Sequence, residues 1–242
     1  MELIEGIKVT KKFGGLTALN NLDFSLDEGE IVGLIGPNGA GKSTLFNVIS
    51  GALRPTSGTI RFKNKDITSL KPHQICKLGI GRTFQIPKPF LNMTVYENVW
   101  AAALFGCAKG KFSEVKHELS HILEKFGLAE KSMMPASSLT IFLLRMLEIA
   151  RALSTKPELL LLDEVMAGLN PTETMQLLKI IRGLRDGEGI TIFMVEHNMR
   201  AIMEVTDRII ALHQGTKIAE GKPEEITKEP SVIEAFLGET YA

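Results

Sequence analysis

The spacing of apolar residues changes along the chain, and each spacing predicts a different kind of element. Up to Phe62 the apolar residues stand in short runs separated by Gly and Asp turns, which is typical of strands. We predict these strands over residues 3–9, 21–26, 30–36 and 58–62. One helix interrupts them, from about Ser43 to Ser50.

Between Lys71 and Ser154 the apolar residues recur three and four positions apart, which predicts helices. The most regular segments cover residues 95–105, 114–128 and 143–153. We therefore expect a helical subdomain over residues 85–154, entered through the proline-containing segment 83–92.

Beyond Ser154 strands and helices alternate. The runs ELLLLD (158–163) and ITIFMV (190–195) are typical of strands buried on both faces. Helices are predicted over 171–184, 198–205 and 230–238, and a hairpin over 208–212 and 217–221. This order predicts one α/β domain of 242 residues. Its core, about 1–84 and 155–242, has a mostly parallel sheet and a small N-terminal antiparallel β subdomain.

Composition and charge narrow the class of protein. Lys plus Arg and Asp plus Glu both number 28, so the formal net charge is zero and gives no reason to expect a nucleic acid partner. No apolar run approaches the ~18 residues that a membrane span needs. The N-terminus carries charges where a signal peptide is apolar. We expect a cytoplasmic chain that reaches a membrane only through a partner.

The segment GPNGAGKST fits the phosphate-binding pattern G-x-x-x-x-G-K-[ST], with a strand before it and a helix after it. Glycines let backbone N–H groups turn toward phosphate oxygens, and the helix N-terminus adds positive potential. Lys42 can contact the β- and γ-phosphates, and the Ser43 hydroxyl can bind Mg²⁺. We predict a nucleotide site at Gly36, Pro37, Asn38, Gly39, Ala40, Gly41, Lys42, Ser43 and Thr44.

Two acids end the buried run LLLLDE, at the sheet edge where open α/β sheets bind ligands. We predict that Asp163 holds Mg²⁺, through water, and that Glu164 orients or deprotonates the attacking water. His197 ends another buried strand at the same edge, which favours a γ-phosphate contact over a bystander role. Gln85 lies between the core and the helical insertion. It can contact either Mg²⁺ or the attacking water.

Phe13, in KKFGG, has two interpretations. Its ring can stack on a nucleotide base, or it can lie on the surface or in the core as an ordinary apolar side chain.

Taken together, these segments resemble the ATP-binding cassette (ABC) family, whose P-loop NTPase fold matches the predicted architecture. GPNGAGKST is similar to the Walker A loop and LLLLDE to Walker B with its catalytic glutamate. By the same resemblance Gln85 is the Q-loop residue, His197 the switch histidine and Phe13 the adenine-stacking aromatic. AGLNP (167–171) resembles the D-loop.

Several segments look like the ATPase subunits of branched-chain amino acid importers. They are KKFGGLTALNNLDFSL, GIGRTFQIPKPFLNMTVYENV, LEIARAL, AGLNPTET and VIEAFLGE. The resemblance implies an ATPase that uses ATP and Mg²⁺ and dimerises with a second ATPase subunit. It also implies permease subunits docked at the helical subdomain, which hold the chain at the inner face of the membrane.

The chain departs from the family at its signature, Leu-Ser-Gly-Gly-Gln, where it has LTIFL (139–143). The missing glycines would allow close approach to the partner's γ-phosphate. Losing two hydrogen bonds to a charged phosphate forfeits ~1.5–3 kcal/mol each. The apolar spacing of the segment permits two interpretations: early helix residues that pack inward, or an exposed contact surface. A second departure is Val165, where the family usually has proline.

The predicted function is therefore the ATP-hydrolysing subunit of an importer, with branched-chain or hydrophobic amino acids as the first candidate cargo. Other cargo, such as urea or a lipid, is an alternative, because substrate choice resides in subunits that this chain does not contain. Another is a nucleotide-binding regulatory subunit with weak turnover, which the altered signature suggests and which Glu164 and His197 argue against. A soluble cassette protein outside transport is a weaker alternative.

Overall fold

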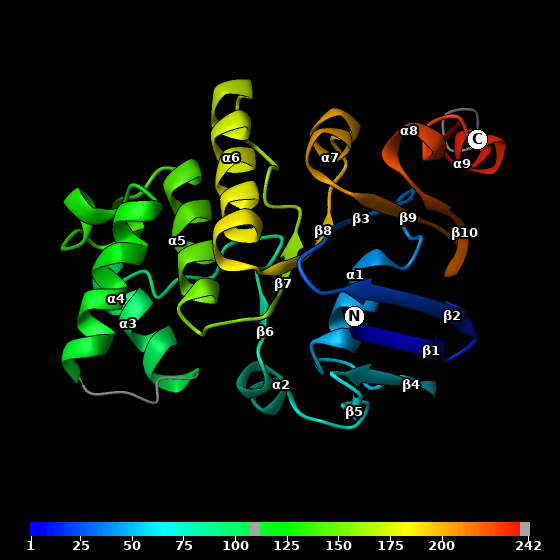
Figure 1. Ribbon diagram of the computed structural model, residues 1–242, viewed down its shortest axis with the longest axis horizontal. Coiled ribbons are helices and arrows are strands. Elements are labelled where there is room, and N and C mark those ends of the chain that lie inside the picture. Colours follow the sequence, from blue (N-terminus) through cyan, green and yellow to red (C-terminus); the bar gives the residue numbers. More distant parts are fainter. Residues whose placement is uncertain (107–111, 238–242) are drawn as a thin grey trace.

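A computed structural model describes residues 1–106 and 112–237, and for residues 112–115 the backbone alone. The chain forms two sheets and a separate group of helices (Figure 1). The last two residues of the VIEAFLGE segment lie outside the described residues.

The larger sheet has six strands in the order β10-β9-β3-β8-β7-β6. Neighbouring strands run parallel except at β9 and β10, which form the predicted antiparallel hairpin. The mostly parallel sheet is thus confirmed. The strands are β3 (Ile31–Ile35), β6 (Ile80–Arg82), β7 (Leu159–Asp163), β8 (Thr191–Val195), β9 (Arg208–His213) and β10 (Thr216–Gly221).

The smaller sheet is antiparallel throughout, with the order β2-β1-β4-β5. It confirms the predicted N-terminal antiparallel β subdomain. Its strands are β1 (Glu2–Phe13), β2 (Leu16–Asp27), β4 (Ser57–Phe62) and β5 (Lys65–Asp66).

Alternate residues of the parallel strands face two different cores, as the two-residue repeat of a strand requires. Leu159 and Leu161 of β7 pack in a cluster with α1 and the antiparallel sheet, whereas Leu160 and Leu162 pack with α5 and α6. Helices α1 (Lys42–Ile49), α6 (Pro171–Glu188) and α7 (Met199–Val205) belong to this layered core. The sheet is therefore covered on both faces, which explains the unbroken apolar runs.

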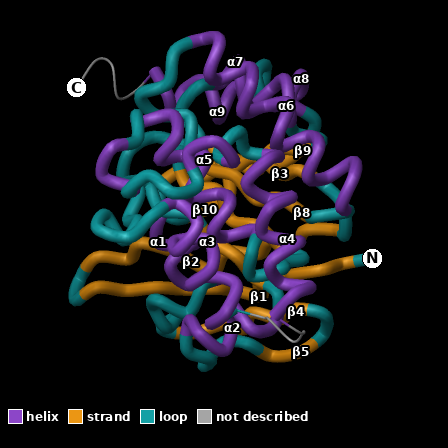
Figure 2. Tube along the Cα trace, turned by 90° about the vertical axis from the view of Figure 1, so that its left-hand side faces the viewer, coloured by secondary structure: helices purple, strands orange, loops and turns teal. Residues whose placement is uncertain are grey.

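The group of helices at the left of Figure 1 contains α3 (Val95–Phe105), α4 (Phe112–Lys125) and α5 (Ile141–Leu153). Two 3-10 turns, Ala129–Lys131 and Ala136–Ser138, join α4 to α5. The shorter helices α2 (Pro72–Leu78), α8 (Pro223–Ile226) and α9 (Pro230–Leu237) belong to the rest of the chain. Figure 2 shows α7, α8 and α9 at the top of the molecule, and α2 at the bottom near β4 and β5.

The prediction of helices alone between Lys71 and Ser154 is wrong at β6. The strand has only three residues and pairs with β7 as the edge of the parallel sheet. Gly79 and Gly81 interrupt any apolar run there, so the two-residue repeat is too short to recognise. As a result, the segment that leads to Gln85 starts from the main sheet.

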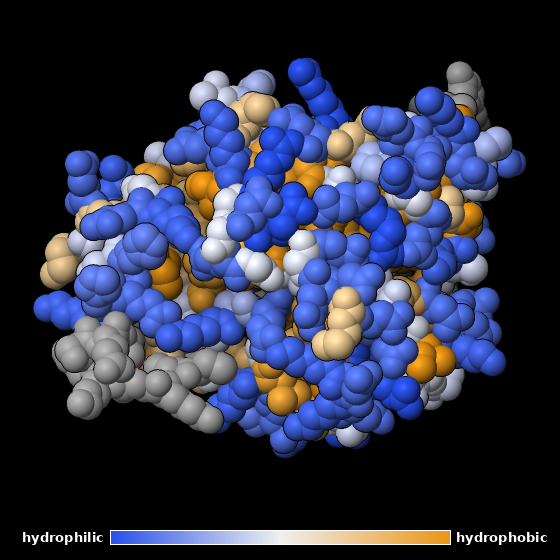
Figure 3. All heavy atoms as spheres, in the orientation of Figure 1, coloured by the Kyte–Doolittle hydropathy of each residue, from blue (hydrophilic) through white to orange (hydrophobic). Residues whose placement is uncertain are grey.

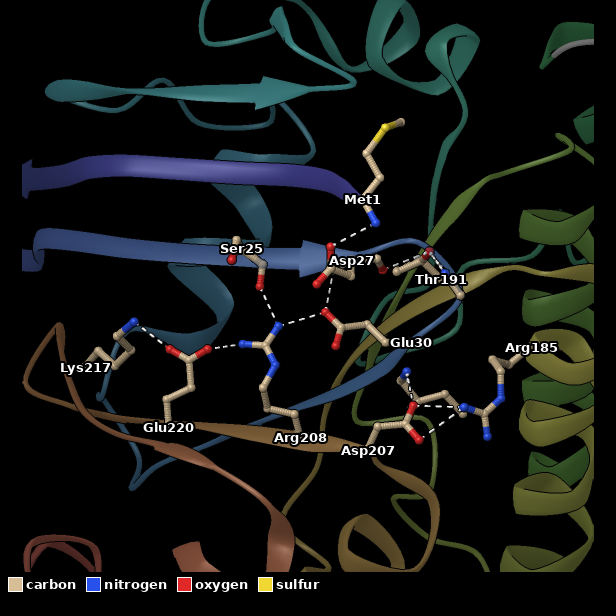
Figure 4. Close-up of polar contacts among 12 residues, drawn as sticks. Met1, Ser25, Asp27, Glu30, Arg185, Thr191, Asp207, Arg208, Lys217 and Glu220 are labelled. Carbon is tan, nitrogen blue, oxygen red and sulfur yellow. Dashed lines mark hydrogen bonds and ion pairs between the residues drawn. The ribbon is translucent and has the colours of Figure 1, made fainter.

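Polar contacts around Arg208 link the two sheets (Figure 4). Its guanidinium donates to the backbone carbonyl of Ser25 at 2.7 Å and to Glu30 Oε1 at 2.7 Å, and it also pairs with Glu220. Lys217 contacts the other oxygen of Glu220 at 2.6 Å. This network fixes β2 against β9 and β10. On the face shown in Figure 3, hydrophilic side chains predominate and apolar ones form small separate groups.

Candidate nucleotide site

The loop between β3 and α1 is shaped by two glycines. Gly36 has φ 150°, and a Cβ there would lie 2.2 Å from the carbonyl oxygen of Leu212. Gly41 has φ 106°, and its Cβ would lie 2.6 Å from the carbonyl oxygen of Ala18. A side chain at either position would collide with backbone, so the tight loop requires glycine at both.

Lys42 begins α1 and its side chain is only 6% exposed. The ammonium group donates to the backbone carbonyls of Gly36 at 2.5 Å and Pro37 at 2.8 Å, which keeps it over the loop. The N-terminus of α1 faces the same loop, and its free N–H groups favour an anion. Ser43 is exposed and Thr44 half-buried, so the Ser43 hydroxyl is open to a ligand.

Asp163 ends β7 with its side chain 5% exposed. Its Oδ2 accepts from Arg82 Nη2 at 3.0 Å, while Oδ1 is buried without a hydrogen-bond partner among the described residues. Burial, which outweighs the effect of Arg82, raises the pKa of the Asp163 carboxyl. The unpaired Asp163 Oδ1 and the exposed Ser43 hydroxyl are hard oxygen ligands of the kind that Mg²⁺ prefers, so these residues fit the predicted ion.

The sequence analysis did not assign Arg82 any role. Besides Asp163, its guanidinium donates to Asn47 Oδ1 at 2.7 Å and to Ser50 Oγ at 2.8 Å, both in or beside α1. It therefore joins the phosphate loop's helix to the acid at the strand end. No sequence signal marks this role, because only the pairing of β6 with β7 brings Arg82 beside Asp163.

The side chains of Gln85 and His197 both contact the carboxylate of Glu164. Gln85 Nε2 donates to Glu164 Oε2 at 2.7 Å, and His197 Nε2 lies 2.9 Å from Glu164 Oε1. Glu164 has φ 50°, a left-handed conformation that is uncommon for a residue with a side chain and occurs often at functional sites. The structure thus brings all three predicted catalytic residues together.

A second buried acid supports the turn after Glu164. Glu196 accepts from the backbone N–H of Met166 at 2.8 Å, and its side chain is largely shielded from water. Burial raises the pKa of Glu196 to about 7. Sequence reasoning missed this residue because an acid next to a strand end is usually solvated.

Phe13 lies at the end of β1, is 45% exposed and has the Lys11 ammonium 5.0 Å from its ring centroid. This exposure excludes the core interpretation. The ring is accessible for stacking on a base.

The LTIFL segment begins α5. Thr140 caps the helix, with its Oγ1 accepting from the Leu143 backbone N–H at 3.4 Å. Phe142 and Leu143 pack against the core, as the inward-packing interpretation predicts, while Ile141 is 60% exposed. Ile141 is also a neighbour of Gly168 in the AGLNP segment, because a Cβ added to Gly168 would lie 3.8 Å from Ile141 Cγ2. The segment therefore packs through most of its apolar residues and exposes one.

The family profile described as "ABC transporter" matches residues 19–167. A second profile, described as "Branched-chain amino acid ATP-binding cassette transporter", matches residues 216–242. The chain therefore belongs to the ABC transporter family and is one of the ATPases of that family.

Two relatives illustrate the similarity. The chain is 44% identical to the high-affinity branched-chain amino acid transport ATP-binding protein LivG of Salmonella typhimurium, over 94% of each chain. It is 39% identical to BraF of Pseudomonas aeruginosa, which has the same description, over 98% of each chain.

Solved structures show the same fold. The ADP conformation of MJ1267, an ATP-binding cassette of an ABC transporter, has a TM-score of 0.89 and 32% identity, covering 98% of this chain and 99% of that one. A dimeric post-hydrolysis state of the cassette MJ0796, bound to ADP and Pi, has a TM-score of 0.82 and 27% identity, covering 91% and 98%. Among the described residues, no helix combines the length and apolar content that crossing a membrane requires.

Proposed function

We propose that this chain is the ATP-hydrolysing subunit of an importer for branched-chain or other hydrophobic amino acids. The observation that carries the proposal is the convergence of Gln85 and His197 on Glu164, on the sheet that also carries the phosphate loop. The C-terminal profile and the relatives' names favour branched-chain amino acids as cargo.

At the phosphate site, the backbone of residues 36–44 and the Lys42 ammonium bind the β- and γ-phosphates. Ser43 and Asp163 would hold Mg²⁺, which would supply positive charge at the phosphate oxygens, and Gln85 would contact the ion or the attacking water. Phe13 stacks on the adenine.

Glu164 orients and deprotonates the attacking water, and His197 contacts the γ-phosphate. The 2.9 Å contact between them supports this division of labour, because it places the histidine beside the base. Gln85, on the other oxygen of the same carboxylate, connects the base with the helical subdomain.

The partner is a second ATPase subunit with a normal signature. LTIFL presents Ile141 where the family has a glycine, and a branched side chain there obstructs close approach to a partner's phosphate. The nucleotide on this chain's own loop then meets the partner's intact signature, whereas the partner's nucleotide meets LTIFL. The dimer has one efficient site.

A turnover comparison tests this asymmetry. We expect the chain alone to hydrolyse ATP slowly and a mixed dimer to hydrolyse it much faster. Replacing residues 140–143 with Ser-Gly-Gly-Gln should accelerate the chain alone. Fast hydrolysis by the unmodified chain would contradict the asymmetry and leave the transport function intact.

Permease subunits dock at the helical subdomain and hold the chain at the inner face of the membrane. A cavity of about 350 Å³ between this subdomain and the core supports the docking position, with Phe84, Cys76 and Ala102 among its lining residues. Exposed apolar side chains at Ile86 and Phe90 follow it along the chain.

The cargo is tested by uptake into vesicles that contain the chain with its co-expressed membrane subunits. We expect ATP-dependent accumulation of labelled leucine, isoleucine or valine, which Glu164→Gln abolishes. Uptake of urea or a lipid in place of amino acids would reassign the cargo. ATP binding without turnover in this complex would favour a regulatory subunit, the function that LTIFL suggests.

A further inference from the structure

The backbone of Phe84, the residue before Gln85, is held at its N–H and at its carbonyl by side chains of helix α5. The backbone N–H of Phe84 donates to Glu148 Oε1 at 2.8 Å, and its carbonyl accepts from Arg145 Nη1 at 3.3 Å. Both side chains come from α5 and both are about 5% exposed. The backbone N–H and carbonyl of Phe84 are thus both fixed by buried polar side chains of α5.

The residues on either side of Phe84 have other anchors. Thr83 belongs to the sheet, because its backbone N–H donates to Leu161 O at 2.9 Å and its Oγ1 accepts from the Asp163 N–H at 3.1 Å. Gln85 contacts the carboxylate of Glu164. Three consecutive residues are therefore held by the sheet, by α5 and by the base, in that order.

We propose that Glu148, assisted by Arg145, is a positioning residue for ATP hydrolysis that acts through Gln85. The pair connects α5, which begins at the LTIFL segment, to the amide that contacts Glu164. The inference deepens the proposed function, because it rests on the role given there to Gln85.

The physical reason is the shortness and stiffness of the connection. The Phe84 carbonyl held by Arg145 belongs to the planar peptide that joins Phe84 to Gln85, and the N–H held by Glu148 is bonded to the same Phe84 Cα. A shift of the Phe84 backbone therefore carries the Gln85 Cα with it. The helix transmits such a shift as a stiff unit, because its backbone hydrogen bonds form within the helix itself. A displacement on the order of 1 Å at a group that positions a reactant can cost about 100-fold in rate.

Ring contacts do not replace this connection. The guanidinium of Arg82 lies 5.2 Å from the Phe84 ring centroid, and the Lys88 ammonium lies 5.7 Å from it. Both contacts hold the side chain, whereas the orientation of Gln85 depends on the peptide. Only Glu148 and Arg145 reach that peptide from α5.

Glu148 also lies beside the cavity at the boundary between the helical subdomain and the core, and its second carboxylate oxygen is buried. Glu148 lines this cavity of about 350 Å³ together with Arg151, and its Oε2 has no hydrogen-bond partner among the described residues. Arg145 Nη1 lies 3.8 Å from that oxygen.

Two substitutions distinguish the effect of the Glu148 acceptor oxygen from the effect of the side-chain volume. Glu148→Gln keeps an oxygen for the Phe84 N–H, and Glu148→Met keeps the volume but removes the acceptor. Burial raises the pKa of Glu148 to about 7, so the neutral glutamine is a close mimic. Glu118→Gln is the control, because Glu118 forms a partly exposed ion pair with Lys156 at 2.8 Å.

The first readout is hydrogen exchange of the Phe84 amide in the full-length chain, which requires neither nucleotide nor partner. We expect protection in the wild type, Glu148→Gln and Glu118→Gln, and faster exchange in Glu148→Met. Equal protection in Glu148→Met would show that the bond does not hold this peptide, and the inference would fail.

The second readout is hydrolysis of labelled ATP by the full-length chain, followed over hours to resolve slow turnover. Glu148→Met should lower kcat about tenfold with the KM for ATP nearly unchanged. Glu148→Gln should stay near the wild type. On a Gln85→Ala background, Glu148→Met should add no further loss, because both changes remove the same connection.

Additive losses in that double variant would show that Glu148 acts by another route, and wild-type kcat in Glu148→Met would also overturn the inference. If Gln85→Ala alone leaves kcat unchanged, the proposed role of Gln85 fails first, and the inference fails with it. If Glu148→Met does not fold, Glu148→Asp replaces it, because its shorter side chain withdraws the acceptor while keeping the charge.

Discussion

Removing the guanidinium of Arg82 should destabilise the protein strongly, because Asp163 would keep a buried charge without its counterion. The Arg82 and Asp163 side chains are 10% and 5% exposed, with Nη2 and Oδ2 3.0 Å apart. Asp163 Oδ1 already lacks a hydrogen-bond partner among the described residues. Arg82→Met also removes the donors to Asn47 and Ser50.

The magnitude follows from the burial of the pair. Removing one partner of a buried ion pair costs about 3–5 kcal/mol, because the other charge remains desolvated. Methionine recovers part of the packing over Phe46, whose ring centroid lies 5.9 Å from the guanidinium. We therefore expect Arg82→Met to lower the free energy of unfolding by about 3 kcal/mol.

Urea unfolding in EDTA measures this loss without any contribution from a bound metal. Arg61→Met is the matched control, because its contact with Glu5 at 3.4 Å is partly exposed and such pairs contribute about 0–1 kcal/mol. The double variant Arg82→Met/Asp163→Asn should regain much of the loss, since no charge then stays unpaired. A loss below about 1 kcal/mol for Arg82→Met would refute the reasoning.

Three further predictions concern other parts of the site. Burial raises the pKa of Glu196 to about 7 from 4.5, so the folded state binds more protons than the unfolded state between these values. Glu196 should therefore lower the free energy of unfolding by on the order of 2–3 kcal/mol as pH rises from 4.5 to 7. In urea titrations Glu196→Gln should reduce the pH slope by this contribution and leave that of Glu148, whose pKa burial also raises. Gly36→Ala should abolish nucleotide binding in a fluorescent-nucleotide titration, because its Cβ would lie 2.2 Å from Leu212 O, and unchanged affinity would contradict the loop geometry. Phe13→Ala should weaken ATP binding by ~1–3 kcal/mol, and calorimetry that finds no change would make Phe13 a surface residue only.

Local patterns predicted most of the fold because most elements carry their own signal. The runs that became β7 and β8 are almost entirely apolar, since both faces of the sheet are covered, one by α1 and the antiparallel sheet and the other by helices. Thr94 with Glu97 forms a capping box at the start of α3, and that helix covers the predicted residues 95–105. The strand β6 has no such signal, because its three residues become a strand only by pairing with β7.

The residues of the site also differ in whether the sequence alone identifies them. The phosphate loop is continuous in sequence, so its glycines and lysine could be identified together. The contacts of Arg82 with Asp163, and of Glu148 with Phe84, join residues more than sixty positions apart. Neither pair has a spacing that a single sequence reveals, because the fold alone brings their elements together. Buried acids such as Glu196 are missed because acids are usually exposed.

The most direct test of the central claim, that a triphosphate on this loop is cleaved with the help of Glu164, is the fate of bound nucleotide in Glu164→Gln. The complex that contains this chain is incubated with labelled ATP and Mg²⁺, and the retained nucleotide is separated and identified. We predict ADP with the wild type and intact ATP, retained for much longer, with Glu164→Gln. Conversion of ATP to ADP by Glu164→Gln at the wild-type rate would contradict the claim.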